Sequence, residues 1–143
     1  MGPVIGYVPG VFDLFHVGHL TMLRQAREHC DVLVAGVVSD EVCLVGKGIQ
    51  PTVPETERAE IVEAIGIVDA VYVERHLDKS EAWRQVGFKR IFKGDDWQGT
   101  PKGDALEHQM LGMGVQVVYF PYTVHTSSTA LRRKLGVTGE RAS

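Results

Sequence analysis

Five short apolar blocks alternate with amphipathic segments along this chain of 143 residues, and this alternation constrains the fold most. The blocks have the length and branched side chains of buried strands. They run over residues 4–8, 32–38, 71–73, 90–92 and 115–120. Helical periodicity covers residues 19–29, 57–65, 79–86, 105–111 and 128–135, with Gly136 as a stop signal. The pattern predicts a doubly wound α/β fold of Rossmann-like type, with five parallel strands and helices on both faces.

The length suits one domain over residues 1–143, and the residues from about 137 onward are expected to form a flexible tail. A net charge of −3 argues against a nucleic-acid partner. No apolar run approaches the ~20 residues that cross a membrane, and the N-terminus does not resemble a signal peptide. Two cysteines without CxxC spacing suggest reduced thiols, so we expect a cytoplasmic protein.

The polar residues gather after the predicted strands. In an open parallel sheet, ligands bind beyond the carboxyl ends of the strands, where the strand order reverses. The loops after residues 8, 38, 92 and 120 meet at that edge, and they hold nearly every unusual polar side chain of the sequence. We therefore expect the functional site there.

Two histidines stand three residues apart in the segment GVFDLFHVGH, residues 10–19, directly after the first predicted strand. If a helix starts near residue 16 or 17, His16 and His19 share the face of its first turn, and Gly18 leaves room for a ligand. A helix N-terminus suits a phosphate, and imidazoles beside it can donate hydrogen bonds to phosphate oxygens. A metal site or a purely structural histidine pair are the alternatives, although zinc would need further ligands.

Residues 11–19 (VFDLFHVGH) resemble the HxGH signature of the cytidylyltransferase-like nucleotidyltransferases, most of all the glycerol-3-phosphate cytidylyltransferase branch. The similarity continues at Lys47-Gly48, at Glu57-Arg58, in the GDDW segment over residues 94–97, and in TVHTSST over residues 123–129. The resemblance implies transfer of CMP from CTP to a small phosphorylated alcohol, with glycerol 3-phosphate favoured and pyrophosphate released. It also implies Mg²⁺ carried by the triphosphate, with no protein metal ligand, and a homodimer.

The resemblance also assigns roles to individual residues. It implies that His16, His19 and Lys47 are catalytic, because in-line phosphoryl transfer needs placement and charge neutralisation at the α-phosphate. The acceptor would contact Lys47, Asp13 and Trp97. The nucleotide would contact Gly10, Val11, Phe12, Asp13, His16, His19, Arg58, Asp95, Thr123, Ser127, Ser128 and Thr129.

Each of these assignments has a simpler alternative. Lys47 can be a solvated loop lysine, and Arg58 a surface arginine paired with Glu55 or Glu60. For Asp13 and the hydroxyls of residues 127–129, helix capping without any ligand contact is the alternative. Trp97 can be a packing residue. For Asp95 or its neighbour, the proposed role is to accept hydrogen bonds from ribose hydroxyls or to hold the magnesium of the triphosphate.

The sequence departs from the family pattern at two positions. Tyr122 stands where the family has an arginine, with Arg132 as a candidate replacement, and His125 stands where the family has a glycine. Two alternatives therefore stay open: an adenylyltransferase that uses ATP and a sugar phosphate, or a nucleotide-binding module without catalysis.

Overall fold

The computed structural model describes residues 2–121 and 126–137. The strands are β1 (Ile5–Gly10), β2 (Val32–Val38), β3 (Ala70–Glu74), β4 (Arg90–Gly94) and β5 (Gln116–Phe120). The helices are α1 (Val17–Arg27), α2 (Asp40–Lys47), α3 (Glu55–Glu63), α4 (Lys79–Val86), α5 (Pro101–Gly112) and α6 (Ser128–Lys134), and a 3₁₀ turn, η1, spans Asp95–Trp97.

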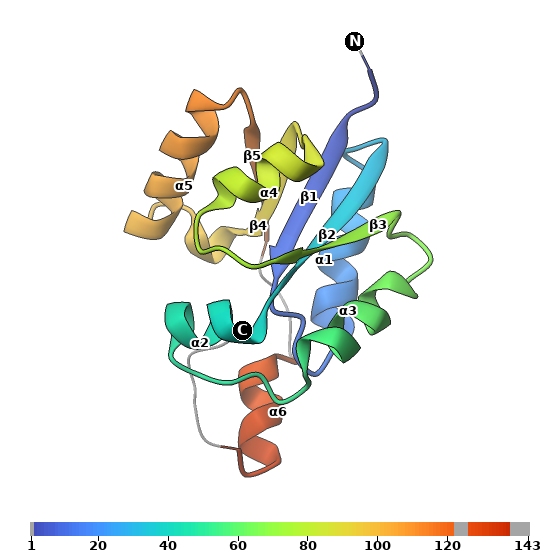
Figure 1. Cartoon of the computed structure of the whole chain (residues 1–143), viewed down its shortest axis with the longest axis vertical. Coiled ribbons are helices and arrows are strands. Elements are labelled where there is room, and N and C mark those ends of the chain that lie inside the picture. The colour runs from blue at the N-terminus through green and yellow to red at the C-terminus, as the bar shows by residue number, and fades with distance from the viewer. Residues whose placement is uncertain (1, 122–125, 138–143) are drawn as a thin grey trace.

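The five strands form one parallel sheet in the order β3-β2-β1-β4-β5, which confirms the predicted fold class. From β1 the chain first winds outward to β2 and β3, then returns across β1 to add β4 and β5 on the other side (Figure 1). The order therefore reverses between β1 and β4. This is where an open α/β sheet leaves a crevice at its carboxyl edge.

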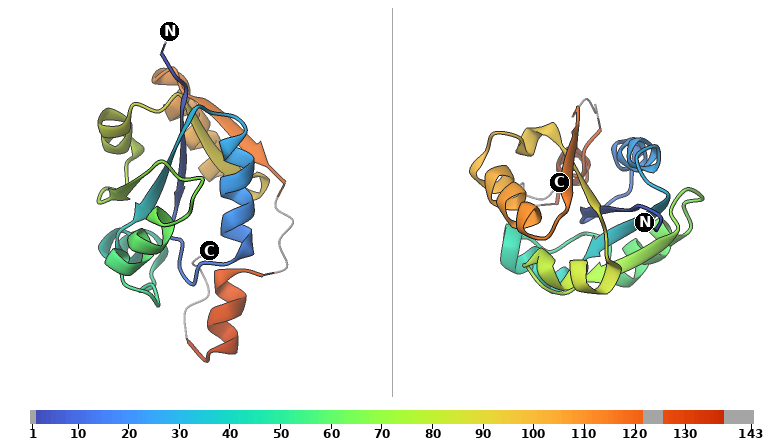
Figure 2. Two further views of the ribbon diagram at one scale, coloured as in Figure 1. Left: turned by 90° about the vertical axis from the view of Figure 1, so that its right-hand side faces the viewer. Right: turned by 90° about the horizontal axis from the view of Figure 1, so that it is seen from above.

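Two apolar clusters cover the two faces of the sheet. One contains Leu23 of α1 and Val62 of α3, and the other contains Ala82 of α4 and Met110 of α5. Because strand side chains alternate, Phe92 joins the first cluster and its neighbour in β4 joins the second. Helices α2 and α6 lie instead beyond the carboxyl edge of the sheet (Figures 1 and 2).

The sequence-based prediction overlooked helix α2. The sequence pattern predicted no helix between residues 38 and 57, but residues Asp40–Lys47 are helical, and the chain turns only after them. The side chain of Ser39 caps the helix by accepting from Val42 N, and Gly48 ends it with a φ of 76°. A serine N-cap followed by a glycine C-cap is a normal helix signal. At eight residues, however, the helix is too short to show clear hydrophobic periodicity.

Several predictions fall outside the described residues. Thr123, Tyr122, His125 and most of the expected tail belong to this group, so their roles stay predictions. Among the helices of the described ranges, none has the length and apolarity needed to span a membrane.

Candidate active site

A cavity opens at the carboxyl edge of the sheet between β1 and β4, where the strand order reverses. Its walls come from the β1 end, from one face of α1, from the β4 end with η1, and from α6. The residues lining it are Val8, Pro9, Gly10, Val11, Phe12, His16, Gly18, His19, Thr21, Met22, Gln25, Lys47, Phe92, Lys93, Gly94, Asp96, Trp97, Pro121, Ser127 and Ser128. The cavity thus brings together residues from both ends of the chain, as expected for this edge.

The turn between β1 and α1 is backbone-strained. Phe12 and Leu14 have φ values of 57° and 53°, in the left-handed region that bulky side chains rarely adopt. Each such residue costs ~1–2 kcal/mol. Such strain persists only when the surroundings fix the backbone, and it is concentrated at functional sites.

The Asp13 carboxylate, between these two residues, supplies much of that fixation. It is fully buried and accepts hydrogen bonds from Thr52 N and Val53 N, each at 2.9 Å. It also forms an ion pair of 2.8 Å with the buried guanidinium of Arg132 on α6. Its backbone carbonyl accepts from Ser128 Oγ at 2.6 Å. Asp13 thus joins the strained turn to α6 and to the loop before α3 and does not line the cavity, and its contact with nucleotide and acceptor stays a prediction.

Arg58 also has its partners inside the protein, and its predicted grip on phosphate stays a prediction. Its side chain is buried and does not line the cavity. It donates to the carbonyls of Val53, Val11 and Val38 at 2.6–2.8 Å, and to Asp40 Oδ1 at 2.6 Å. The guanidinium satisfies backbone acceptors at the ends of two strands, so it holds the edge of the sheet together. The alternative pairing with Glu55 or Glu60 is likewise not what the structure has.

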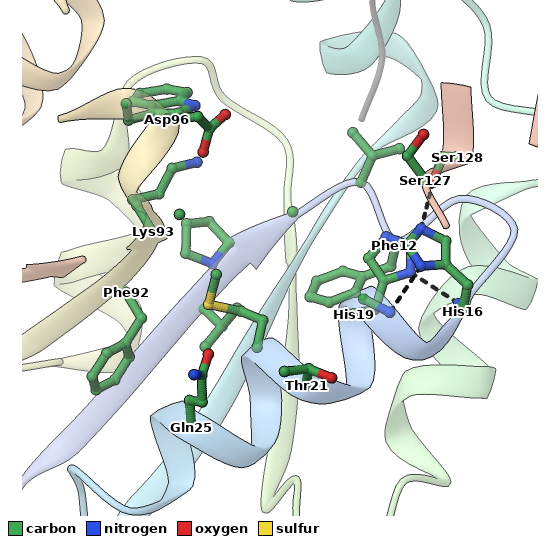
Figure 3. Close-up of a pocket in the computed structure, with 18 of the residues that line it drawn as sticks. Phe12, His16, His19, Thr21, Gln25, Phe92, Lys93, Asp96, Ser127 and Ser128 are labelled. Carbon is green, nitrogen blue, oxygen red and sulfur yellow. Dashed lines mark hydrogen bonds between the residues drawn. The ribbon is translucent and has the colours of Figure 1, made fainter. Parts of the chain in front are cut away.

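His16 and His19 form a capping box at the start of α1. His16 is the N-cap residue, and its Nδ1 accepts from Gly18 N at 3.0 Å. Nδ1 of His19 accepts in return from His16 N at 3.1 Å. The two ring centroids lie 3.9 Å apart, as the i, i+3 spacing predicted, and Figure 3 shows both rings side by side at the cavity.

This cap determines where the imidazole protons lie. Because each Nδ1 accepts a backbone N–H, a neutral ring carries its own proton on Nε2. Burial lowers the pKa of His16, and burial together with the charge of His16 lowers the pKa of His19 to about 3. Both rings are therefore neutral near pH 7 and present Nε2–H donors. Nε2 of His16 lies 3.4 Å from Ser128 Oγ, at the junction of α1 and α6.

Two lysines line the cavity, and Lys93 lies on the side opposite the histidines (Figure 3). Lys47 comes from the last turn of α2, and burial lowers its pKa. Lys93 comes from β4, and its Nζ lies 3.8 Å from the centroid of the Trp97 ring. Burial and the nearby Lys79 and Lys47 lower the pKa of Lys93 to about 7. Our sequence analysis had not included Lys93 in the site. Its signal was its place two residues beyond Ile91, on the same side of a strand that ends at the cavity.

The other predicted site residues divide between the cavity and its surroundings. Gly10, Val11, Phe12 and Trp97 line the cavity, as do Ser127 and Ser128. Ser127 also caps α6 by accepting from Ala130 N at 3.0 Å. Thr129 and Asp95 do not line the cavity, and the carboxylate there is that of Asp96 instead. Arg132 is held by Asp13 inside the protein, so it does not replace the family arginine in the cavity.

The described part of the chain contains no group of three or more His, Cys, Asp or Glu side chains arranged to hold a metal ion. The histidine pair uses its Nδ1 atoms within the protein and lies next to a serine hydroxyl. These partners suit hydrogen bonding to a ligand better than metal coordination.

Sequence comparison identifies relatives along most of the chain. A bifunctional protein HldE from Hyphomonas neptunium is 32% identical over 91% of this chain and 26% of its own length. An ethanolamine-phosphate cytidylyltransferase from Arabidopsis thaliana is 49% identical over 71% of this chain and 25% of its own length. A FAD synthase from Pyrococcus abyssi is 34% identical over 80% of this chain and 78% of its own length. The chain thus spans about a quarter of the first two relatives and most of the third.

Solved structures share the fold. A lipopolysaccharide core biosynthesis protein from Thermoplasma volcanium superposes with a TM-score of 0.72 at 23% identity, covering 87% of this chain and 100% of the other. A pantothenate synthetase from Thermus thermophilus gives 0.63 at 22% identity, covering 90% of this chain and 61% of the other. The cytidylyltransferase-like family profile matches residues 7–134. Together with the relatives above, this match shows that the chain belongs to the cytidylyltransferase-like family of nucleotidyltransferases.

Proposed function

We propose that this protein transfers CMP from CTP to a small phosphorylated alcohol, with glycerol 3-phosphate as the favoured acceptor. An oxygen of the acceptor phosphate attacks the α-phosphorus of the nucleotide and forms the new P–O bond. The bond between that phosphorus and the oxygen bridging to the β-phosphate breaks, and pyrophosphate leaves. The acceptor is already an anion at neutral pH, so the reaction needs placement and charge neutralisation rather than a general base.

The histidine pair is the observation that carries this proposal. Two neutral imidazoles, with Nδ1 engaged by the backbone, direct Nε2–H donors at one place in the cavity. Donors fixed in this way stabilise charge that develops on phosphoryl oxygens without reorganising during the reaction. The hydroxyls of Ser127 and Ser128 lie on the same side and would contact the leaving pyrophosphate. Magnesium would arrive on the triphosphate and neutralise part of its charge.

The identity of the nucleotide rests on similarity. The relative named ethanolamine-phosphate cytidylyltransferase and the GDDW segment support CTP and a phosphorylated alcohol. The relatives named FAD synthase and HldE support a second candidate, in which ATP supplies an adenylyl group to another phosphate ester. The wall formed by Thr21, Met22, Gln25 and Phe92 is uncharged and suits either base (Figure 3).

A nucleotide-by-acceptor screen for pyrophosphate release tests both candidates. CTP and ATP are each offered, with Mg²⁺, to glycerol 3-phosphate, ethanolamine phosphate, a sugar 1-phosphate and flavin mononucleotide. We expect the fastest release with CTP and glycerol 3-phosphate, and none after Mg²⁺ is chelated. Faster release with ATP would replace the first candidate by the second. Nucleotide binding without any release would establish a module that has no catalytic activity.

A homodimer and a cytoplasmic location complete the proposal. Light scattering on the purified protein tests the dimer. The partners proposed are thus a nucleoside triphosphate, a phosphorylated acceptor and a second copy of the chain.

A further inference from the structure

The two lysines of the cavity differ from a neighbouring lysine in their ion pairing. Among residues 2–121 and 126–137, neither Lys47 nor Lys93 forms an ion pair, whereas the nearby Lys79 pairs with Glu74 at 2.6 Å. Both ammonium groups come from elements that end at the cavity, one from α2 and one from β4. Two part-buried cations that form no ion pair are stabilised when an anion binds between them.

Lys93 is held in place by its neighbours. Its Nζ lies over the Trp97 ring, and this cation–π contact replaces part of the hydration that the ammonium group loses on burial. Asp96, exposed and also in the cavity wall, forms no ion pair with this ammonium group in the described residues, but its charge and that of Glu74 partly oppose the lowering of the Lys93 pKa by burial. In Figure 3, Lys93 and Asp96 lie on one side of the cavity, with His16, His19 and the two serines on the other.

This separation fits the two reacting phosphates. In an in-line displacement, the attacking and leaving oxygens lie on opposite sides of the phosphorus. If the α-phosphorus sits at the histidines and pyrophosphate leaves toward the serines, the attacking phosphate enters from the side of Lys93. A dianionic phosphate there would meet the ammonium group of Lys93 in a cavity that Lys47 also lines, as a charge-assisted site requires.

We propose that Lys93 binds the phosphate of the acceptor together with Lys47, so that these two lysines restrict acceptors to phosphate esters. This inference rests on the proposed function, and it assigns to Lys93 a specificity role that the family signature does not include. Burial is the main cause of the lowered pKa of Lys93, and the positive charges of Lys79 and Lys47 add to it.

The first test compares Lys93→Met with Lys102→Met. Lys102 is the matched control because its Nζ lies 5.7 Å from the Trp97 centroid, yet its side chain is exposed and does not line the cavity. We expect Lys93→Met to raise the KM for the acceptor about 10- to 100-fold. The KM for the nucleotide should change less than about twofold, and Lys102→Met should leave both values unchanged. An unchanged acceptor KM, or an equal rise in the nucleotide KM, would overturn the assignment.

A second measurement does not depend on turnover. In a Trp83→Phe background, Trp97 is the only tryptophan, and it reports directly on the ammonium stacked over it. We expect inorganic phosphate to change Trp97 fluorescence in this background and in Lys102→Met, but not in Lys93→Met. An equal response in Lys93→Met refutes the phosphate site. If no nucleotide and acceptor react in the screen, the proposed function fails, while this titration still decides whether Lys93 binds phosphate.

Discussion

Each residue of the histidine pair performs two tasks with two different nitrogens. Nδ1 caps the helix, and Nε2 is the donor that we propose for the phosphate, with Nε2 of His16 lying 3.4 Å from Ser128 Oγ. A substitution to alanine removes both tasks, so it cannot tell a structural histidine from a catalytic one. Asparagine separates them, because its short side chain is a preferred N-cap but cannot reach where Nε2 lies.

We expect His16→Asn to lower kcat about 10²- to 10³-fold, the usual effect of losing one such donor. The thermal midpoint should stay near that of the parent protein, because the cap on Gly18 N is kept. His16→Ala should lose the activity and also about 1 kcal/mol of stability. Steady-state kinetics and thermal unfolding of the two variants check this, and full activity in His16→Asn would rule out a catalytic donor.

The lowered pKa of His19 predicts a dependence of stability on pH. In the unfolded chain this histidine gains a proton near pH 6.5, whereas in the folded chain it stays neutral down to about pH 3. Between these values the unfolded state binds more protons. The free energy of unfolding therefore falls as the pH falls, by at most ~1.4 kcal/mol per pH unit from this group.

Urea unfolding of the parent protein and of His19→Asn between pH 7 and pH 4 measures this contribution. We expect the free energy of unfolding to fall less steeply in the variant, since the carboxylates contribute to both proteins alike. Parallel curves would mean that His19 is protonated in the folded protein as readily as in the unfolded one.

At the residue scale, the sequence predicted the histidine cluster better than the charged residues around it. The i, i+3 spacing fixes how two side chains lie on one helix, so the contact between His16 and His19 followed from local geometry. Whether Arg58 faces a ligand or the protein depends on which carbonyls the fold brings near it. For Lys93, the alternation along β4 gives the side of the strand on which it lies, but not whether that side meets a cavity or solvent.

At the element scale, α6 depends on polar anchors. None of its side chains belongs to the apolar clusters of the described residues. It is attached instead through Arg132 and Ser128, both of which bind Asp13 in the strained turn. The helix that brings the serines to the cavity is thus fixed to the turn that holds the histidines.

We expect Arg132→Met to destabilise the protein by about 3–5 kcal/mol, because it leaves the buried Asp13 carboxylate without its cation. Arg133→Met is the matched control, since that side chain is exposed, and it should change stability by no more than about 0.5 kcal/mol. Chemical denaturation gives both values. Equal stability of the two variants would show that the buried ion pair contributes little.

Helices and strands with a clear hydrophobic pattern were predicted from the sequence. Helical segments that only capping residues signal were not. The long apolar run of β2 and the amphipathic α1 could be assigned from the sequence. Helix α5 begins at Pro101, four residues before the predicted start, because Thr100 caps it and proline occupies its first turn. Helix α2 was missed for the related reason that its signals lie only at its two ends.

At the scale of the whole molecule, the alternation of strands and helices predicted a parallel sheet but not its strand order. The strand order depends on which edge of the sheet each later strand pairs with, and tertiary packing decides this. The reversal between β1 and β4 nevertheless matters most for function, because it opens the cavity between them.

The polar attachment of α6 predicts that activity disappears before the fold does. Regions with few buried apolar contacts open at lower free energy than the core. We expect turnover to be lost at a lower urea concentration than the fluorescence change of Trp83, which packs against the apolar cluster containing Ala82. Coincident transitions would show that α6 and the sheet unfold as one unit.

A bound nucleotide that contacts the histidines and the serines would link α6 to the turn before α1. The nucleotide would bind only the form in which α6 is attached to the rest of the domain. Saturating nucleotide should therefore shift the loss of activity toward the urea midpoint of global unfolding. The chain would then keep its last helix closed most firmly while substrate is present, and would be most open to proteases at that end when substrate runs out.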